Sequence, residues 1–210
     1  MAETPSTAPA DTPQVEGYPG LRPEDSLKYY IELWKSSVDV QKHFNDIEWR
    51  IRGLALTVAT FALGAAGVAA KDGTRMGPIS LGSMVLVLGL ILWYAFYYVD
   101  RYWYHPLLRA AVKEGEIFEL AIAQYLPEAH MTQGITANSP QPASRWMRVL
   151  AGSAGYAKSD DPNPEPGHEY VMKSDHKLRW FYRVGAFALS LAALALEIVA
   201  LIAWCRVHTP

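Results

Sequence analysis

The chain has 210 residues, a formal net charge of −2 and one cysteine, Cys205. One cysteine excludes an internal disulfide, and a nearly neutral chain without a basic, aromatic-rich patch gives no indication of nucleic-acid binding. Half of the residues are apolar and only 19% are charged, which favours a class in which large apolar surfaces are buried or face lipid.

Three stretches are almost free of charge. Residues 53–70 and 76–99 contain no Asp, Glu, Lys or Arg, and residues 184–205 contain only Glu197. A helix needs roughly 20 mostly apolar residues to cross a bilayer. The sequence therefore predicts an all-α membrane protein with three transmembrane helices and the lipid bilayer as its first partner.

The segment 1–22 is rich in Pro, Thr and Ala and cannot bury enough apolar surface to fold. It has no basic group followed by an apolar core, so it is not a signal peptide. We expect a disordered tail.

Residues 23–126 are predicted to form a helix, a two-span hairpin and a second helix, with spans at about 53–70 and 77–99. The first helix begins near Pro23 and carries apolar residues at heptad spacing, which requires a partner helix. The amphipathic stretch 107–126 is the natural partner, because the short hairpin 71–78 makes the two spans antiparallel neighbours. The first two spans would thus extend into a cytoplasmic antiparallel helical stalk. Its expected interface consists of Tyr30, Leu33, Val40, Phe44, Ile47, Leu108, Phe118 and Ile122.

Small residues recur along the first two spans and predict close helix packing within the membrane. They are Gly53, Thr57, Thr60, Gly64 and Gly67 in the first span, and Gly82 and Gly89 in the second.

An aromatic belt, WYAFYYVDRYWYH, ends the second span at residues 93–105. Asp100, Arg101 and His105 within it are compatible with a catalytic cluster. Anchoring at the membrane interface with local ion pairing is the favoured interpretation, since such belts are typical of membrane proteins.

Residues 127–173 have no periodicity and are predicted to be an irregular cytoplasmic linker with a short helix near 144–151. Ser174 suits the N-cap of the third transmembrane helix, which with a short tail makes up residues 174–210.

Glu197 interrupts the third apolar stretch and shares a helical face with Ser190. Burial would favour its neutral form, which could donate a hydrogen bond to Thr57, Thr60 or Ser83. Two interpretations stay open: a polar clasp that holds the third span to the hairpin or to another copy, and an ion or proton site.

Basic residues indicate the orientation. Eleven Lys and Arg residues flank the spans on one side, against Lys71, Arg75 and Arg206 on the other. Basic flanks are retained in the cytoplasm. We therefore expect a multi-pass protein of a bacterial inner (plasma) membrane, with the N-terminus and the 100–180 region inside and the C-terminus outside.

Catalytic and cofactor motifs are missing from the sequence. The six histidines show no i, i+4 pairing, and there is no glycine-rich phosphate loop or nucleophile elbow. We expect no enzyme activity, no metal and no cofactor.

Three stretches together resemble a family of uncharacterised small three-span bacterial inner-membrane proteins: DVQKHFNDIEWRIRGLALT at 39–57, DRYWYHPLLRAAVKEGE at 100–116 and KSDHKLRWFYR at 173–183. More loosely, the helix–hairpin–helix order is similar to SLATT-type modules, two-span effectors of bacterial conflict systems. That resemblance implies oligomerisation and membrane perturbation in response to a sensor, and no catalytic residues.

The leading functional hypothesis is a self-associating membrane protein, a homo-oligomer acting as a membrane-perturbing effector or accessory subunit. One alternative is a small ion or proton carrier that uses Glu197. Another is a passive membrane scaffold whose stalk recruits a cytoplasmic protein.

Overall fold

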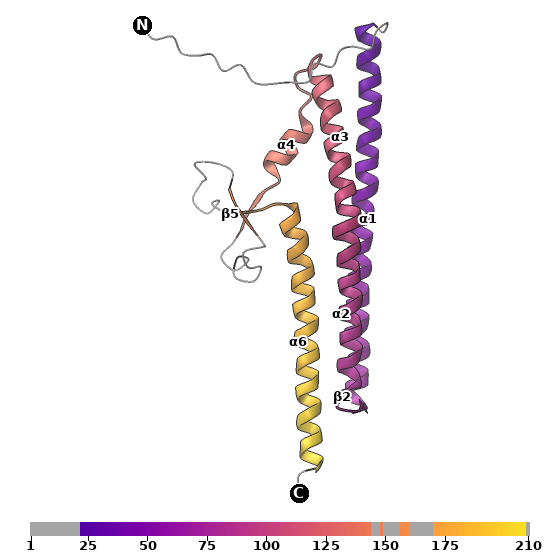
Figure 1. Cartoon of the computed structure of the whole chain (residues 1–210), viewed down its shortest axis with the longest axis vertical. Coiled ribbons are helices and arrows are strands. Elements are labelled where there is room, and N and C mark those ends of the chain that lie inside the picture. The colour runs from indigo at the N-terminus through magenta and orange to yellow at the C-terminus, as the bar shows by residue number, and fades with distance from the viewer. Residues whose placement is uncertain (1–21, 144–147, 149–155, 160–169, 209–210) are drawn as a thin grey trace, which may run out of the picture.

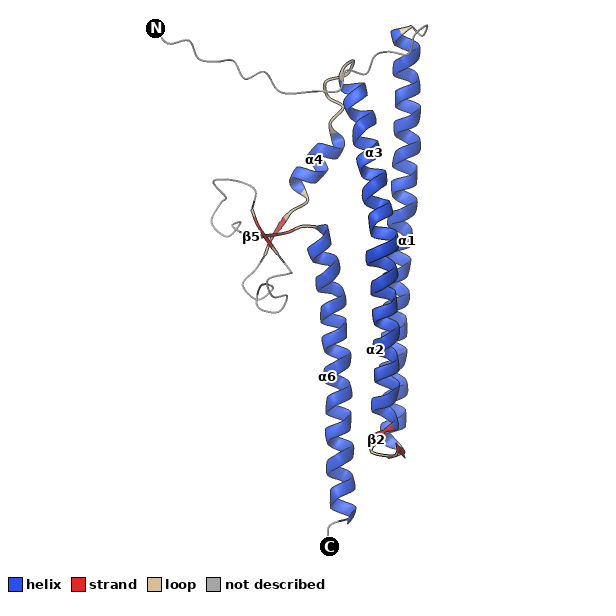
Figure 2. Ribbon diagram, in the orientation of Figure 1, coloured by secondary structure: helices blue, strands red, loops and turns tan. Residues whose placement is uncertain are grey.

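Three long helices dominate the molecule (Figures 1 and 2). The computed structural model describes residues 22–143, 148, 156–159 and 170–208. In chain order these form α1 (Pro23–Lys71), β1 (Arg75–Met76), β2 (Ile79–Ser80), α2 (Leu81–Val99), η1 (Asp100–Tyr104), α3 (His105–Ala123), α4 (Met131–Asn138), β3 (Gln141–Pro142), β4 (Ala157–Lys158), β5 (Tyr170–Met172) and α6 (Ser174–His208). Residues 1–21 of the tail expected at 1–22 and most of the helix expected at 144–151 lie outside the described residues.

The first helix runs unbroken through 49 residues. It begins with Pro23, whose missing N–H costs nothing at a helix start, and Glu24 and Asp25 follow where the helix dipole favours acids. Its apolar half then packs antiparallel against α2 through a tight hairpin in which β1 pairs with β2. Gly73 and Gly77 take positive φ angles of 65° and 68° in that turn.

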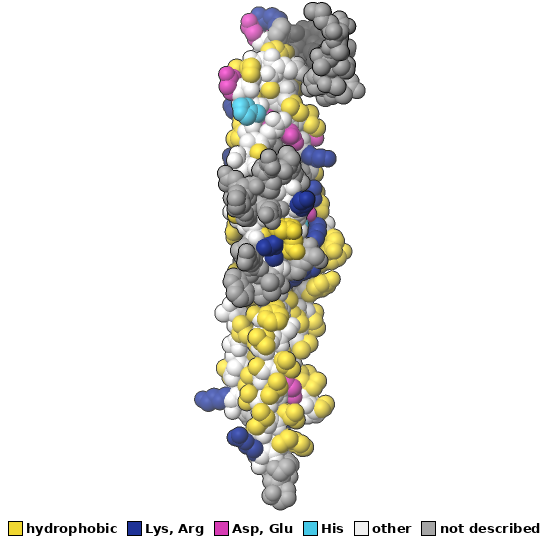
Figure 3. All heavy atoms as spheres, turned by 90° about the vertical axis from the view of Figure 1, so that its left-hand side faces the viewer, with side chains coloured by type: hydrophobic (Ala, Val, Ile, Leu, Met, Phe, Trp, Pro, Cys, Tyr) yellow, Lys and Arg dark blue, Asp and Glu magenta, His cyan; other side chains and the backbone are white. Residues whose placement is uncertain are grey.

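Three helices are long and apolar enough to cross a membrane: Glu24–Lys71, Leu81–Ala123 and Ser174–Arg206. In the second of these, α2, η1 and α3 form one continuous rod. Figure 3 shows apolar side chains covering the lower half of the visible face and most charged side chains in the upper half. We call these two parts the apolar half and the polar half.

The core of the apolar half is made of alanines, leucines and two aromatic residues. It consists of Ala55, Ala62, Ala66, Leu86, Trp93, Leu178, Tyr182 and Leu189. Alanines on α1 and glycines on α2 permit close approach, because a β-carbon on Gly89 would lie 2.7 Å from Ala62 Cβ. The third helix, α6, packs against α2, and a β-carbon on Gly185 would lie 2.1 Å from Trp93 Cζ2.

In the polar half, α1 pairs with α3, but along a line shifted from the expected seam. Leu33 and Val40 are 49% and 43% exposed, whereas Ser37 is buried. Ser37 Oγ and Gln41 Nε2 both donate to the Ala111 carbonyl oxygen, at 3.2 and 3.1 Å. Small residues at this contact let the helices approach there, so the larger apolar side chains are turned to the flank. Of the other expected seam residues, Ile122 is buried and Tyr30, Phe44, Ile47, Leu108 and Phe118 are half-buried.

The segment expected to be an irregular linker contains regular structure. Residues 131–138 form α4, and β3, β5 and β4 form a small antiparallel sheet in that order. A local prediction misses such two- and three-residue strands because they pair across about 30 residues, Gln141 with Met172.

Gly185→Ala is predicted to destabilise the protein. The added methyl group would overlap the buried Trp93 ring, and overpacking of this kind costs about 1–3 kcal/mol. The thermal unfolding midpoint of purified protein in mild detergent should fall. Gly134→Ala in α4 is the control, because nothing lies within 4 Å of that β-carbon. Equal unfolding midpoints for the two variants would contradict the packing.

Candidate functional site: an ionic network joining three helices

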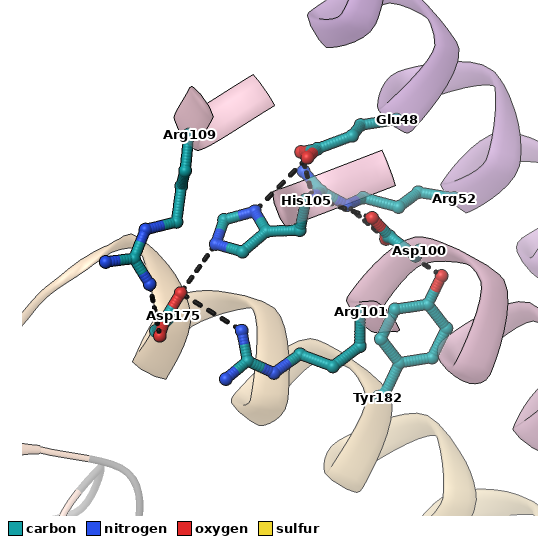
Figure 4. A network of polar contacts seen from close by, with 8 residues as sticks. All are labelled: Glu48, Arg52, Asp100, Arg101, His105, Arg109, Asp175 and Tyr182. Carbon is teal, nitrogen blue, oxygen red and sulfur yellow. Dashed lines mark hydrogen bonds and ion pairs between the residues drawn. The ribbon is translucent and has the colours of Figure 1, made fainter. Parts of the chain in front are cut away.

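A network of polar side chains lies where the apolar and polar halves meet (Figure 4). Its members come from all the long helices. They are Glu48 and Arg52 on α1, Asp100 and Arg101 on η1, His105 and Arg109 on α3, and Asp175 and Tyr182 on α6.

A local change in helix winding brings Asp100 and His105 to the same side. In an α-helix, residues five apart point about 140° away from each other. Here η1 is a π-turn, in which the His105 N–H donates to the Asp100 carbonyl oxygen. Pro106 follows directly and has no N–H to give to a carbonyl four residues earlier. As a result, both side chains are buried, with Asp100 0% and His105 4% exposed.

Asp100 is the centre of the first part of the network. Arg52 Nε donates to its Oδ2 at 2.9 Å, and the Tyr182 hydroxyl donates to the same oxygen at 3.1 Å. Arg52 also bonds Glu48, one turn earlier on α1, at 2.6 Å. A buried carboxylate is tolerated only when it is paired and hydrogen-bonded. Asp100 therefore ties α1 and α6 to the end of α2.

His105 is the centre of the second part. Its Nδ1 lies 3.1 Å from Glu48 Oε1 on α1, and its Nε2 lies 2.5 Å from Asp175 Oδ1 in the first turn of α6. Asp175 also accepts from Arg101 Nη1 at 3.2 Å and pairs with Arg109 Nη1 at 3.5 Å. One imidazole thus bridges carboxylates from two different helices.

These contacts shift the pKa values of both partners. The hydrogen bond to Glu48, aided by Asp175, raises the pKa of His105 above its usual 6.5, against the opposing effect of burial. Burial by itself would raise the pKa of Asp175, but the hydrogen bond from His105 and the charges of Arg101 and Arg109 lower it. Both shifts favour a charged imidazole beside a charged Asp175.

The network differs from the local pairing expected for the aromatic belt. Asp100 and His105 bond residues 48 to 82 positions away in the sequence. The polar atoms of Asp100 and His105 already bond other members of the network. This arrangement favours a role in holding the helices in register over a role in acting on a substrate. Among the described residues, no group of three or more His, Cys, Asp or Glu side chains could hold a metal ion.

Glu197 lies at the hairpin turn, at the other end of α2. Its carboxylate accepts from the Ser80 backbone N–H at 3.0 Å and from Ser80 Oγ at 2.8 Å, and pairs with Arg75 at 3.2 Å. Thr57 and Thr60 instead donate to carbonyls of their own helix, those of Gly53 and Leu56. Ser190 is exposed, so the structure does not bring these three residues to Glu197.

The glycines of the first two spans divide into two groups. Gly82 and Gly89 face α1, and β-carbons there would lie 2.8 Å from the Ala66 carbonyl and 2.7 Å from Ala62 Cβ. Gly53, Gly64 and Gly67 have nothing within 4 Å. They share an exposed face of α1 with Thr57 and Thr60. Of these five glycines, only the two on α2 are therefore used for packing within one chain.

Another buried carboxylate, Glu119, escaped the sequence analysis. It accepts from Trp34 Nε1 at 3.0 Å and from the Thr132 N–H and hydroxyl at 2.8 and 2.9 Å. It thereby connects α1, α3 and the first turn of α4. Glu119 follows Phe118 directly and lies on the face of α3 that packs against α1, and this position could have predicted its burial.

Arg52→Met is predicted to lower the free energy of unfolding by about 3 kcal/mol. The change leaves Asp100 and Glu48 buried without their shared cation, and breaking a buried pair costs about 3–5 kcal/mol. The lower end applies because the Arg52 side chain is 20% exposed. Arg50→Met, at an exposed position two residues away, is the matched control for chemical denaturation in detergent. Equal stability of the two variants would show that Arg52 does not hold the network.

Glu197→Gln is predicted to retain more thermal stability than Glu197→Leu. The amide oxygen of Gln still accepts from Ser80, whereas Leu leaves the Ser80 donors and Arg75 without their partner. Unfolding midpoints measured in the same detergent would rank wild type first and Leu last. An unchanged midpoint in the Leu variant would exclude a clasp role for this carboxylate.

No protein-family model, no curated protein and no solved structure matches this chain. The functional conclusions below are therefore based on its own residues and geometry.

Proposed function

We propose that the chain is a three-span integral membrane protein that self-associates in a bacterial inner membrane. Large apolar side chains in the apolar half are turned outward, among them Phe61 at 77%, Val68 at 67% and Phe187 at 66% exposed. Such a surface is costly in water and is what lipid-facing helices present. The apolar band in Figure 3 supports the same conclusion.

The proposed orientation places the polar half in the cytoplasm. The ionic network and the basic residues around it would lie at the inner boundary of the membrane, and the hairpin turn and the end of α6 on the outer side. The outward-facing aromatic residues Tyr98, Tyr102 and Trp103, 48% to 59% exposed, would lie at the level of the inner headgroups.

The main support for self-association is the exposed face of α1 that is lined by small residues. Gly53, Gly64 and Gly67 have open space around them, while the glycines of α2 are in tight contact. Transmembrane helices associate through such faces because close backbone approach gains van der Waals contact without a hydrophobic driving force. A second copy is the proposed occupant. If the protein is a membrane-perturbing effector, assembly of several copies would be the step that perturbs the membrane.

A scaffold function is the second candidate. Between α1 and α3 in the polar half lies a shallow groove of about 220 Å³, lined by Leu33, Ser36, Ser37, Val40, Ala111, Glu114 and Phe118. It lies on the exposed flank of the helix pair and could receive a cytoplasmic protein. The carrier alternative gains less support, because the contacts of Glu197 with Ser80 and Arg75 account for that carboxylate as a tertiary clasp.

Gly64→Val together with Gly67→Val is predicted to weaken self-association. The branched side chains would hold two α1 helices apart, and a loss of about 1.4 kcal/mol corresponds to tenfold weaker association. Energy transfer between labelled copies in liposomes, measured against the protein-to-lipid ratio, reports the change. Ala195→Val, at an exposed site on α6, is the control and should leave the curve unchanged.

The contact is also open to direct detection in the Cys205→Ser background. Thr60→Cys should form an intermolecular disulfide in membranes, and Ala195→Cys should not. A protein that stays monomeric at high protein-to-lipid ratio, with no Thr60→Cys cross-link, would exclude the self-association proposal.

A further inference from the structure

The imidazole of His105 contacts one carboxylate on α1 and one on α6, and its protonation state sets how many N–H groups it can donate to them. Neutral imidazole has one N–H, whereas the charged ring has two. Both acceptors of His105, Glu48 Oε1 and Asp175 Oδ1, are carboxylate oxygens, which can only accept when ionised. With a neutral ring, one of the two carboxylates must face a bare nitrogen lone pair.

We propose that His105 is a pH-sensitive lock that fastens the first turn of α6 to the α1–α3 pair when charged and releases this contact, so that the turn is held more loosely, when neutral. The proposal rests on the network geometry and does not require self-association.

Because His105 is buried between three helices, the stability of their junction depends on the charge of its ring. The side chain is 5% exposed, so water cannot replace a lost contact readily. The contact with Asp175 joins α3 to the first turn of α6, and the contact with Glu48 joins α3 to α1. The loss of either one removes one of the contacts that hold a helix at this junction.

Other charged groups around the ring keep part of the junction in place when His105 is neutral. Arg52 on α1 and Asp100 on η1 are engaged with each other, as is Glu48 with Arg52. Arg101 and Arg109 both contact Asp175. Arg109 is 67% exposed and holds it weakly, so Arg101 is the main partner that Asp175 keeps when His105 is neutral. Tyr182 is committed to Asp100.

The direction of the pH effect follows from the shifts. Because the pKa of His105 is raised in the folded protein, its stabilising contribution is complete below 6.5 and is lost as the pH rises through the folded value. The pKa of Asp175 is lowered, so this acceptor stays charged throughout that range. The pKa of the neighbouring His176 is lowered by burial and by Arg179, so His176 does not titrate on the alkaline side.

Spin labels report the release directly. One pair is placed at Arg50→Cys and Ser174→Cys, both exposed positions on α1 and at the start of α6, in a Cys205→Ser background. A second pair at Phe61→Cys and Tyr94→Cys, in the apolar half, serves as the internal reference. Distance distributions are measured in nanodiscs from pH 5.5 to 9.5.

The first pair is expected to give a narrow distribution at low pH and a broader one at high pH, with a midpoint above 6.5. The reference pair should not change. His105→Gln should remove the pH dependence, and His176→Gln should retain it. Asp175→Asn removes one acceptor and should move the midpoint to lower pH, which gives a second readout should His105→Gln fail to fold.

Three outcomes would overturn the proposal. They are a wild-type distribution that is constant over the whole range, a transition that persists in His105→Gln, and a midpoint unaffected by Asp175→Asn.

Discussion

Burial of the Asp100 carboxylate constrains the whole arrangement of helices. A fully buried negative charge requires a cation and hydrogen-bond donors at fixed places. Here Arg52 supplies them from α1 and Tyr182 from α6. Only one alignment of the helices along their axes brings both donors to Asp100. The ionic network therefore fixes the axial register of all three long helices.

The consequence is visible at the opposite end of α2. With Tyr182 level with Asp100, the antiparallel course of α6 brings Ala193 to Ser83 and Glu197 to Ser80 and Arg75. Between these two polar ends the contacts are non-directional, through alanines, glycines and the ring of Trp93. Polar groups thus specify the alignment, and close packing in between supplies contact energy. The aromatic cluster adds one directional contact, since Trp93 Nε1 donates to the Tyr182 carbonyl oxygen at 2.8 Å.

The parts of the molecule that the sequence predicted are those governed by local composition. Three uncharged stretches, a start at Pro23 and close packing at Gly82 and Gly89 can be inferred from spacing alone. The position of Glu197 beside the hairpin turn could not be inferred in this way. It depends on how far α6 is shifted along α2, and the sequence of α6 alone does not contain that shift. The π-turn before Pro106 could not be predicted either. The sequence has helical periodicity on both sides of it, and one extra residue in the turn only changes which face of the helix the later residues occupy. The seam on α1 was misplaced because the contact is set by Ser37, Ala111 and Gly115, whose small size counts for more than the apolar character of Leu33 and Val40.

The lock at His105 and the proposed contact between copies use different sides of α1. The face that packs within the chain carries Glu48, Ala55, Ala62 and Ala66, all buried. Gly64, with open space around it, lies about half a turn away from Ala62 and Ala66, since successive residues are about 100° apart. A second copy on that face would therefore leave α6 and the ionic network uncovered. Assembly and release of α6 can then occur independently, and any effect of one on the other would have to pass through the backbone of α1. Since α1 runs as one unbroken helix past both the ionic network and the small-residue face, it is the element through which such coupling would act.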